Sequence, residues 1–70
     1  MHPLSMAKAG DVCTIKWMFG LPEVVAYMHS CQIREGSTIQ VIKAGTDVLI
    51  IGSGDRRIAL APEIASRIQV

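Results

Sequence analysis

The sequence has few aromatic residues and little net charge, and both features limit what it can bind. Trp17, Phe19 and Tyr27 are the only aromatic residues among 70, so the core must be built from aliphatic side chains. A barrel that binds single-stranded nucleic acid stacks bases on aromatic rings, and few are present here. Charged residues make up 19% of the chain, their signs are mixed, and the net charge is +1. Because a nucleic-acid binder needs a basic surface, we expect no nucleic-acid partner.

Cysteine and long apolar runs are also scarce. Cys13 and Cys31 are too few to indicate a disulfide framework, and they predict reduced, buried thiols. The first ten residues lack the continuous apolar stretch of a secretory signal. The longest aliphatic run, residues 48–51, is far too short to span a bilayer. We therefore expect a cytoplasmic protein that does not insert into the membrane.

The composition instead favours one small folded domain. Hydrophobic residues make up 50% of the chain, which is too apolar for a disordered segment. A chain of this length has room for a single core, so residues 1–70 are expected to form one domain.

Alternating apolar and polar residues predict several short strands. In residues 12–18, Cys13, Ile15 and Trp17 share one face, which is typical of a half-buried strand with Trp17 in the core. Met18 or Phe19 would then lie at the surface. Further strands are predicted over residues 37–43, 47–52, 56–60 and 68–70, and the glycine-containing turn 53–55 predicts a hairpin.

One helix is expected between the first two of these strands. Pro22 suits the first position of a helix, and Glu23 complements the helix dipole, so the helix is predicted over residues 22–30. Residues 62–67 can hold one further helical turn. The result is a mostly β fold, with about five short strands and one short helical insert. Close, regular strand spacing favours a small SH3-like barrel, with an OB-like barrel as the alternative.

The candidate catalytic and metal-binding residues are sparse. His29 and Cys31 combine a base with a nucleophile, but residues two apart on a helix do not share a face. We therefore expect no enzyme. The same two residues are weak candidates for a metal site, because structural zinc sites use two Cys/His pairs and the chain has no C-x-x-C.

Partner binding is the remaining possibility. Arg56 and Arg57 are adjacent on a predicted strand and must point to opposite faces. One of them is a candidate for lining a partner-binding surface, and the other is a candidate for a solvated charge at the sheet edge. Exposed apolar residues recur at interfaces. The candidate partner-binding residues are Met18, Phe19, Tyr27 and Arg57.

The order of these segments resembles the FeoA family, the small cytoplasmic companions of the bacterial ferrous iron transporter FeoB. The resemblance rests on Leu4, on the turn 9–11, and on segments 33–41, 57–60 and 65–70. It implies an SH3-like barrel with a helical insert and no catalytic residues. It also implies a role in ferrous iron uptake through binding of the cytoplasmic portion of FeoB.

Two functional hypotheses follow from the residues and the resemblance together. The first is a non-catalytic adaptor of the transporter that requires no cofactor. The second is a metal-binding or metal-sensing module for Fe(II) or another transition metal, which the family's similarity to iron-dependent repressors implies. The oligomeric state stays open.

Overall fold

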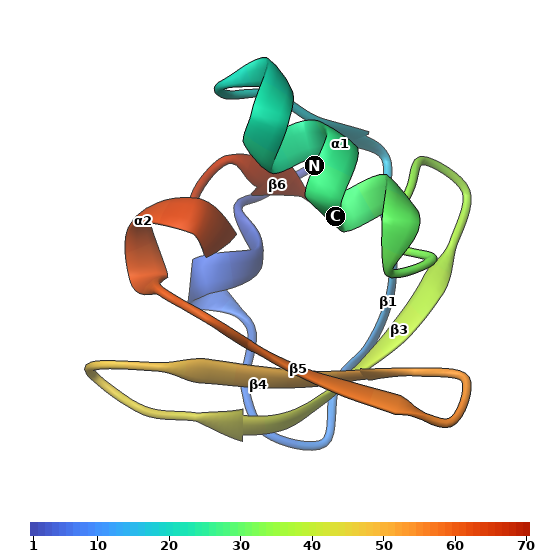
Figure 1. Ribbon diagram of the computed structural model, residues 1–70. Helices are drawn as coiled ribbons and strands as arrows, with labels where there is room; N and C mark the ends of the chain where they lie inside the picture. The colour runs from blue at the N-terminus through green and yellow to red at the C-terminus, as the bar shows by residue number, and fades with distance from the viewer.

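The computed structural model describes residues 1–70 and contains six short strands, two α-helices and a 3₁₀ turn (Figure 1). In chain order the elements are η1 (Leu4–Met6), β1 (Val12–Thr14), β2 (Trp17–Met18), α1 (Pro22–Ser30), β3 (Thr38–Ala44), β4 (Leu49–Ser53), β5 (Arg56–Leu60), α2 (Pro62–Ala65) and β6 (Ile68–Gln69).

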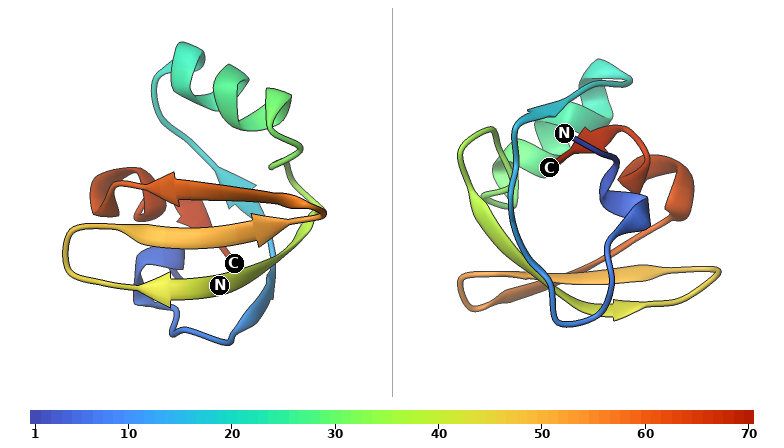
Figure 2. Two further views of the ribbon diagram at one scale, coloured as in Figure 1. Left: turned by 60° about the horizontal axis from the view of Figure 1, so that its bottom comes forward. Right: turned by 180° about the vertical axis from the view of Figure 1, so that it is seen from behind.

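The strands form two antiparallel sheets. The larger sheet has the order β1-β3-β4-β5, and the smaller one is a ribbon of β2 and β6 (Figure 2). The chain begins beside the ribbon, because Pro3 bridges to Gln69. The mostly β, SH3-like architecture predicted from the sequence is confirmed. The hydrogen-bonded ladder is divided between the two sheets, and there is one more strand than expected.

The additional strand arises because the predicted strand 12–18 changes sheets in its middle. The Ile15 amide donates to the Ser37 carbonyl at 2.9 Å, and the Ile15 carbonyl accepts from Gly36 at 2.8 Å. The next amide, that of Lys16, donates instead to the Gln69 carbonyl at 2.8 Å. The chain therefore leaves β3 after Ile15 and joins β6, so that β1 and β2 belong to different sheets.

This change of sheet corrects two predictions about side-chain direction. Ile15 is buried as expected, with 1% of its surface exposed. Trp17 was predicted to lie in the core, but it is 52% exposed, and Met18 is 6% exposed. The alternation assumed one uninterrupted strand. Because the register restarts after Lys16, Met18 points inward and Trp17 points outward.

The helix α1 spans the predicted residues 22–30 and lies at the periphery of the core. Leu21 is extended, and Pro22 opens the helix with a fixed φ. The helix ends where Gln32 adopts φ 67° and the Ile33 amide donates to the Met28 carbonyl at 2.9 Å. Met28 is the helix's one fully buried residue. The predicted turn at residues 62–67 is present as α2.

A single aliphatic core lies between the two sheets and the helices. The inward residues of β3 and β4 alternate with outward ones, as half-buried strands require. The cluster consists of Leu4, Ala7, Ile15, Met18, Met28, Cys31, Ile33, Ile39, Val41, Leu49, Ile51, Leu60, Ala65, Ile68 and Val70. None of the three aromatic residues belongs to it, so the core is aliphatic as predicted.

Glycine closes the β4–β5 hairpin. Gly54 has φ 64° in the two-residue turn between Ser53 and Arg56, a conformation that glycine adopts without strain. The five cross-strand pairs that follow place Ile51 opposite Ile58 and Gly52 opposite Arg57. The hairpin predicted from residues 53–55 is therefore confirmed.

The central position of Ile51 yields a stability prediction. Its side chain is fully buried, so Ile51→Ala should lower the free energy of unfolding by about 2–5 kcal/mol through lost burial and a residual cavity. Ile42 on the neighbouring strand is 38% exposed, and Ile42→Ala should cost less than about 1 kcal/mol. Urea unfolding followed by circular dichroism measures both. Equal losses would contradict the proposed core.

Candidate functional site

An exposed aromatic pair covers the outer face of the small ribbon. Trp17 and Phe19 follow each other at a spacing of two, so both side chains leave the same face. Their ring centroids lie 4.9 Å apart with 29° between the planes, and the rings are stacked. Phe19 is 44% exposed. Stacking of this kind is worth about 0.5–1.5 kcal/mol beyond the buried area, so it favours one relative orientation of the two rings.

The chain continues from Phe19 through Gly20 and Leu21 to the start of α1. The Phe19 amide donates to the Arg67 carbonyl at 3.0 Å, which prolongs the ribbon beyond β2. Gly20 has φ 138°, and a side chain there would meet the Arg67 Cδ at 3.4 Å, so the Arg67 side chain lies against this glycine. Leu21 is 56% exposed. We call Trp17, Phe19 and Leu21 the aromatic patch; Arg67 provides a positive charge beside it.

Tyr27 is exposed on α1, toward the end of the helix that Cys31 closes. Its interaction with the Cys31 side chain, first as a hydrogen bond and second through the thiolate charge, raises the pKa of the Tyr27 hydroxyl. No stacking joins Tyr27 to the aromatic pair. Tyr27 therefore offers an exposed ring on α1 that is separate from the aromatic pair.

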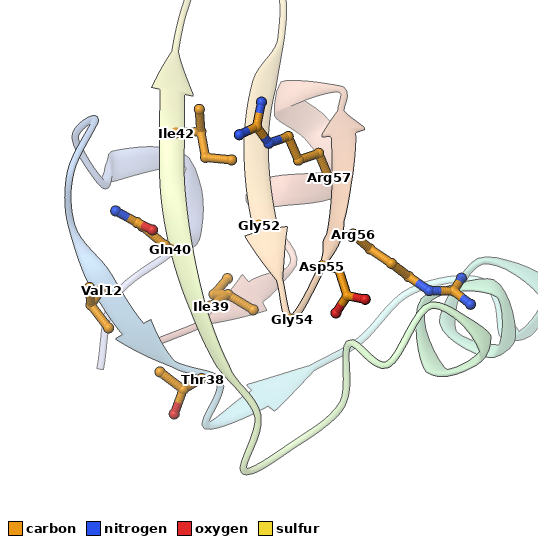
Figure 3. Close-up of a pocket in the computed structure, with 10 residues that line it drawn as sticks. All are labelled: Val12, Thr38, Ile39, Gln40, Ile42, Gly52, Gly54, Asp55, Arg56 and Arg57. Atoms are coloured by element: carbon orange, nitrogen blue, oxygen red, sulfur yellow. The ribbon is translucent and has the colours of Figure 1, made fainter.

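A second feature lies on the outer face of the four-stranded sheet (Figure 3). It is an open hollow of about 420 Å³, which we call the sheet hollow. The Arg57 side chain reaches over it, whereas the Arg56 guanidinium points away (Figure 3). The two arginines therefore diverge as the sequence predicts. The lining residues are Val12, Thr38, Ile39, Gln40, Ile42, Gly52, Gly54, Asp55, Arg56 and Arg57.

The structure separates the four predicted partner-binding residues. Phe19 belongs to the aromatic patch and Tyr27 lies on α1, but Arg57 lines the sheet hollow. The prediction that Met18 or Phe19 lies at the surface holds for Phe19, and Met18 lies in the core.

The candidate metal ligands His29 and Cys31 differ in their surroundings. The His29 Nε2 lies 3.5 Å from the Glu35 Oε1, and both side chains are 46% exposed. Cys31 is 8% exposed at the end of the helix. No group of three or more His, Cys, Asp or Glu side chains is close enough to hold a metal ion. Metal binding at His29 and Cys31 stays a prediction.

The second cysteine, Cys13, is a free thiol whose side chain packs against the core from β1. Burial raises the pKa of the Cys13 thiol above its usual 9.0, and the nearby Asp11 carboxylate adds to the rise. Cys13 is half-buried and Cys31 is buried. The thiol of Cys13 is therefore protonated at neutral pH and a weak nucleophile.

Sequence reasoning missed Trp17 and Leu21 as surface residues, and it missed the sheet hollow. Lys16 fits the alternation of an uninterrupted strand, so the sequence carried no local signal of the change of sheet. The hollow depends on which residues of four strands face each other, and that register is not visible in the sequence.

Solved structures share this fold over most of the chain. A crystal structure of an iron uptake regulatory protein, FeoA, is 28% identical, covers 94% of this chain and 89% of its own, and has a TM-score of 0.85. The solution structure of a FeoA protein from Chlorobium tepidum is 19% identical, with 96% of this chain and 66% of that chain covered and a TM-score of 0.89. No curated protein sequence matches the chain.

A manganese-dependent transcriptional repressor has the same fold in part of its length. Its TM-score is 0.86 at 18% identity; 96% of this chain is covered but 39% of the repressor. The fold thus defines a small SH3-like module that occurs alone or within larger regulators.

The family is established by the sequence itself. The FeoA domain matches residues 2–70, and the chain belongs to the FeoA domain family. This domain is a non-catalytic accessory domain, and membership implies a role in ferrous iron transport. None of the helices combines the length and apolar character that crossing a bilayer requires.

The surroundings of Cys13 predict slow alkylation. At pH 7.5, iodoacetamide should modify Cys13 more slowly than it modifies a cysteine in an unstructured peptide, because the raised pKa keeps the Cys13 thiol protonated. The rate of Cys13 alkylation should reach half of its maximum above pH 9.0. Peptide mass spectrometry separates Cys13 from the buried Cys31. Asp11→Asn should move the midpoint downward, and a midpoint below 9.0 in the unmodified chain would contradict this assignment.

Proposed function

We propose that this chain is a non-catalytic accessory protein of bacterial ferrous iron uptake that binds the cytoplasmic portion of the FeoB transporter. Family membership supports the role in iron transport. The 28% identical FeoA structure, which its description calls an iron uptake regulatory protein, supports the same assignment. The protein acts in the cytoplasm, where it meets the soluble portion of the transporter.

The observation that carries the proposal is the aromatic patch. Trp17, Phe19 and Leu21 occupy every second position of one short segment, and each has roughly half of its surface exposed. Aromatic residues are enriched at the centres of protein interfaces, where Trp contributes strongly to affinity. A small domain whose core is wholly aliphatic yet whose largest rings are outside uses those rings for contact with another molecule.

The local backbone holds this patch in place before binding. The ribbon fixes Phe19 through Arg67, the two rings are stacked, and Pro22 fixes the direction in which α1 leaves Leu21. An interface that is ordered in advance loses less side-chain entropy on association. Arg67 adds a positive charge at the rim, where a partner carboxylate would improve orientation and association rate.

The proposal predicts that the patch determines affinity. Trp17→Ala and Phe19→Ala should each weaken binding of the purified FeoB cytosolic domain by about tenfold or more, a loss typical of an interface hot spot. Isothermal titration calorimetry in the presence of nucleotide measures the affinity. Amide NMR titration should show shifts concentrated between residues 17 and 27.

Met6 supplies the matched control, because it is 70% exposed and lies on η1, which contributes no residue to the aromatic patch. Met6→Ala should bind as the unmodified protein does. If the cytosolic domain shifts no amide at high concentration, or if Met6→Ala weakens binding as much as Trp17→Ala, the proposed interface is wrong.

A further inference from the structure

A row of residues in register crosses the outer face of the four-stranded sheet. Val12 pairs with Gln40, Gln40 with Gly52, and Gly52 with Arg57. Directly opposed residues of antiparallel strands point to the same side of a sheet, so all members of the row share the outer face. Three strand spacings of about 4.8 Å give the row a length of about 14 Å. The row is hollow at β4, where Gly52 has no side chain.

Gly52 is not required by the backbone. The glycines with positive φ are Gly10, Gly20, Gly36 and Gly54, so an L-residue could adopt the Gly52 conformation. Glycine weakens a strand, and its presence within one often marks a place where another backbone or a ligand approaches closely. A Cβ at Gly52 would lie 3.2 Å from the Ile42 Cδ1 and would fill the floor of the sheet hollow.

The side chains around this floor have no partners within the protein. Thr38, Gln40 and Arg57 form no side-chain hydrogen bond, and the one ion pair of the molecule joins His29 to Glu35. Figure 3 shows the Arg57 guanidinium above Gly52 on the side of Ile42, with the Asp55 carboxylate at the turn. Arg57 is therefore free to pair with an incoming carboxylate.

Exposed aliphatic side chains lie among the polar residues that line the hollow. Val12 on β1 is 68% exposed, and Ile42 on β3 is the outward aliphatic residue at a β-bulge between Val41 and Lys43. A ligand with aliphatic groups beside a carboxylate complements these aliphatic side chains and Arg57 together. Arginine holds a carboxylate through two parallel hydrogen bonds, which fixes both position and orientation.

We propose that the sheet hollow binds a short, extended acidic segment of a partner protein. One Asp or Glu of the segment pairs with Arg57, and its backbone passes over Gly52 toward Val12. An extended chain covers about 14 Å in four or five residues. A hollow open along a sheet face cannot enclose most of a small molecule, as small-ligand pockets do, so a peptide strand is the fitting occupant.

This site is distinct from the aromatic patch. α1 and the β4–β5 hairpin lie on opposite sides of the molecule in Figure 1, and the two sites share no residue. The inference therefore does not depend on the transporter being the partner. Its test uses a peptide alone, so its failure leaves the proposed function intact.

The test is an amide NMR titration of the full chain with a blocked hexapeptide, GVELEG, and with its neutral counterpart, GVQLQG. The acidic peptide should shift the amides of Gln40, Gly52 and Arg57, and the neutral peptide should not. Arg57→Gln should weaken the affinity by about tenfold or more, the effect of losing a charge-assisted hydrogen bond. Gly52→Val should abolish the shifts by filling the floor.

Controls make each outcome decisive. Arg34→Gln removes the same charge from the connector after α1, and it should leave the affinity within about twofold. Spectra of Gly52→Val with native dispersion show that loss of binding is not unfolding. Equal shifts from GVQLQG, undiminished binding by Arg57→Gln, or shifts mapping to the aromatic patch would overturn the proposal. Equal shifts from sodium glutamate at matched carboxylate concentration would reduce the site to one for free anions and also overturn it.

Discussion

The passage of the chain from one sheet to the other at Ile15 and Lys16 is the constraint on which the rest of the structure depends. Two consecutive residues bond to different parts of the chain, Ile15 to Ser37 just before β3 and Lys16 to Gln69 of β6. The Ile15 side chain is buried in the core. Because the register restarts there, Met18 closes the core and Trp17 faces solvent. The aromatic patch is thus a consequence of backbone hydrogen bonding, which an uninterrupted strand would have turned inward.

Much of the fold was predictable because local signals agreed with the final packing. Pro22 predicted the start of α1, the turn around Gly54 predicted its hairpin, and alternation predicted β3 and β5 to within a residue. The break after Ile15 was not predictable, since it depends on a bond to Gln69 from the far end of the chain. For the same reason the sequence predicted Phe19 and Arg57 as contact residues but not the surfaces to which they belong.

The two proposed binding surfaces differ in their chemistry. The aromatic patch presents large rigid rings, which suit a broad apolar contact that excludes water. The sheet hollow presents one unpaired cation above a glycine floor, which suits a narrow strand with a charge at a defined position. A module of this size could therefore contact two separate segments of a partner at once. Two linked contacts gain affinity because the first raises the effective concentration of the second.

The two ends of the chain are hydrogen-bonded to each other. His2 and Val70 exchange two backbone bonds, of 3.0 and 2.8 Å, so the backbone forms a nearly closed ring. Tension applied to the two ends would act first on these two hydrogen bonds. Breaking them would separate the ends of the chain next to the buried residues Leu4 and Ile68. A short covalent link between the ends would make that separation impossible and would cost little loop entropy. Because residues 2 and 70 are hydrogen-bonded to each other, the fold is suited to backbone cyclisation.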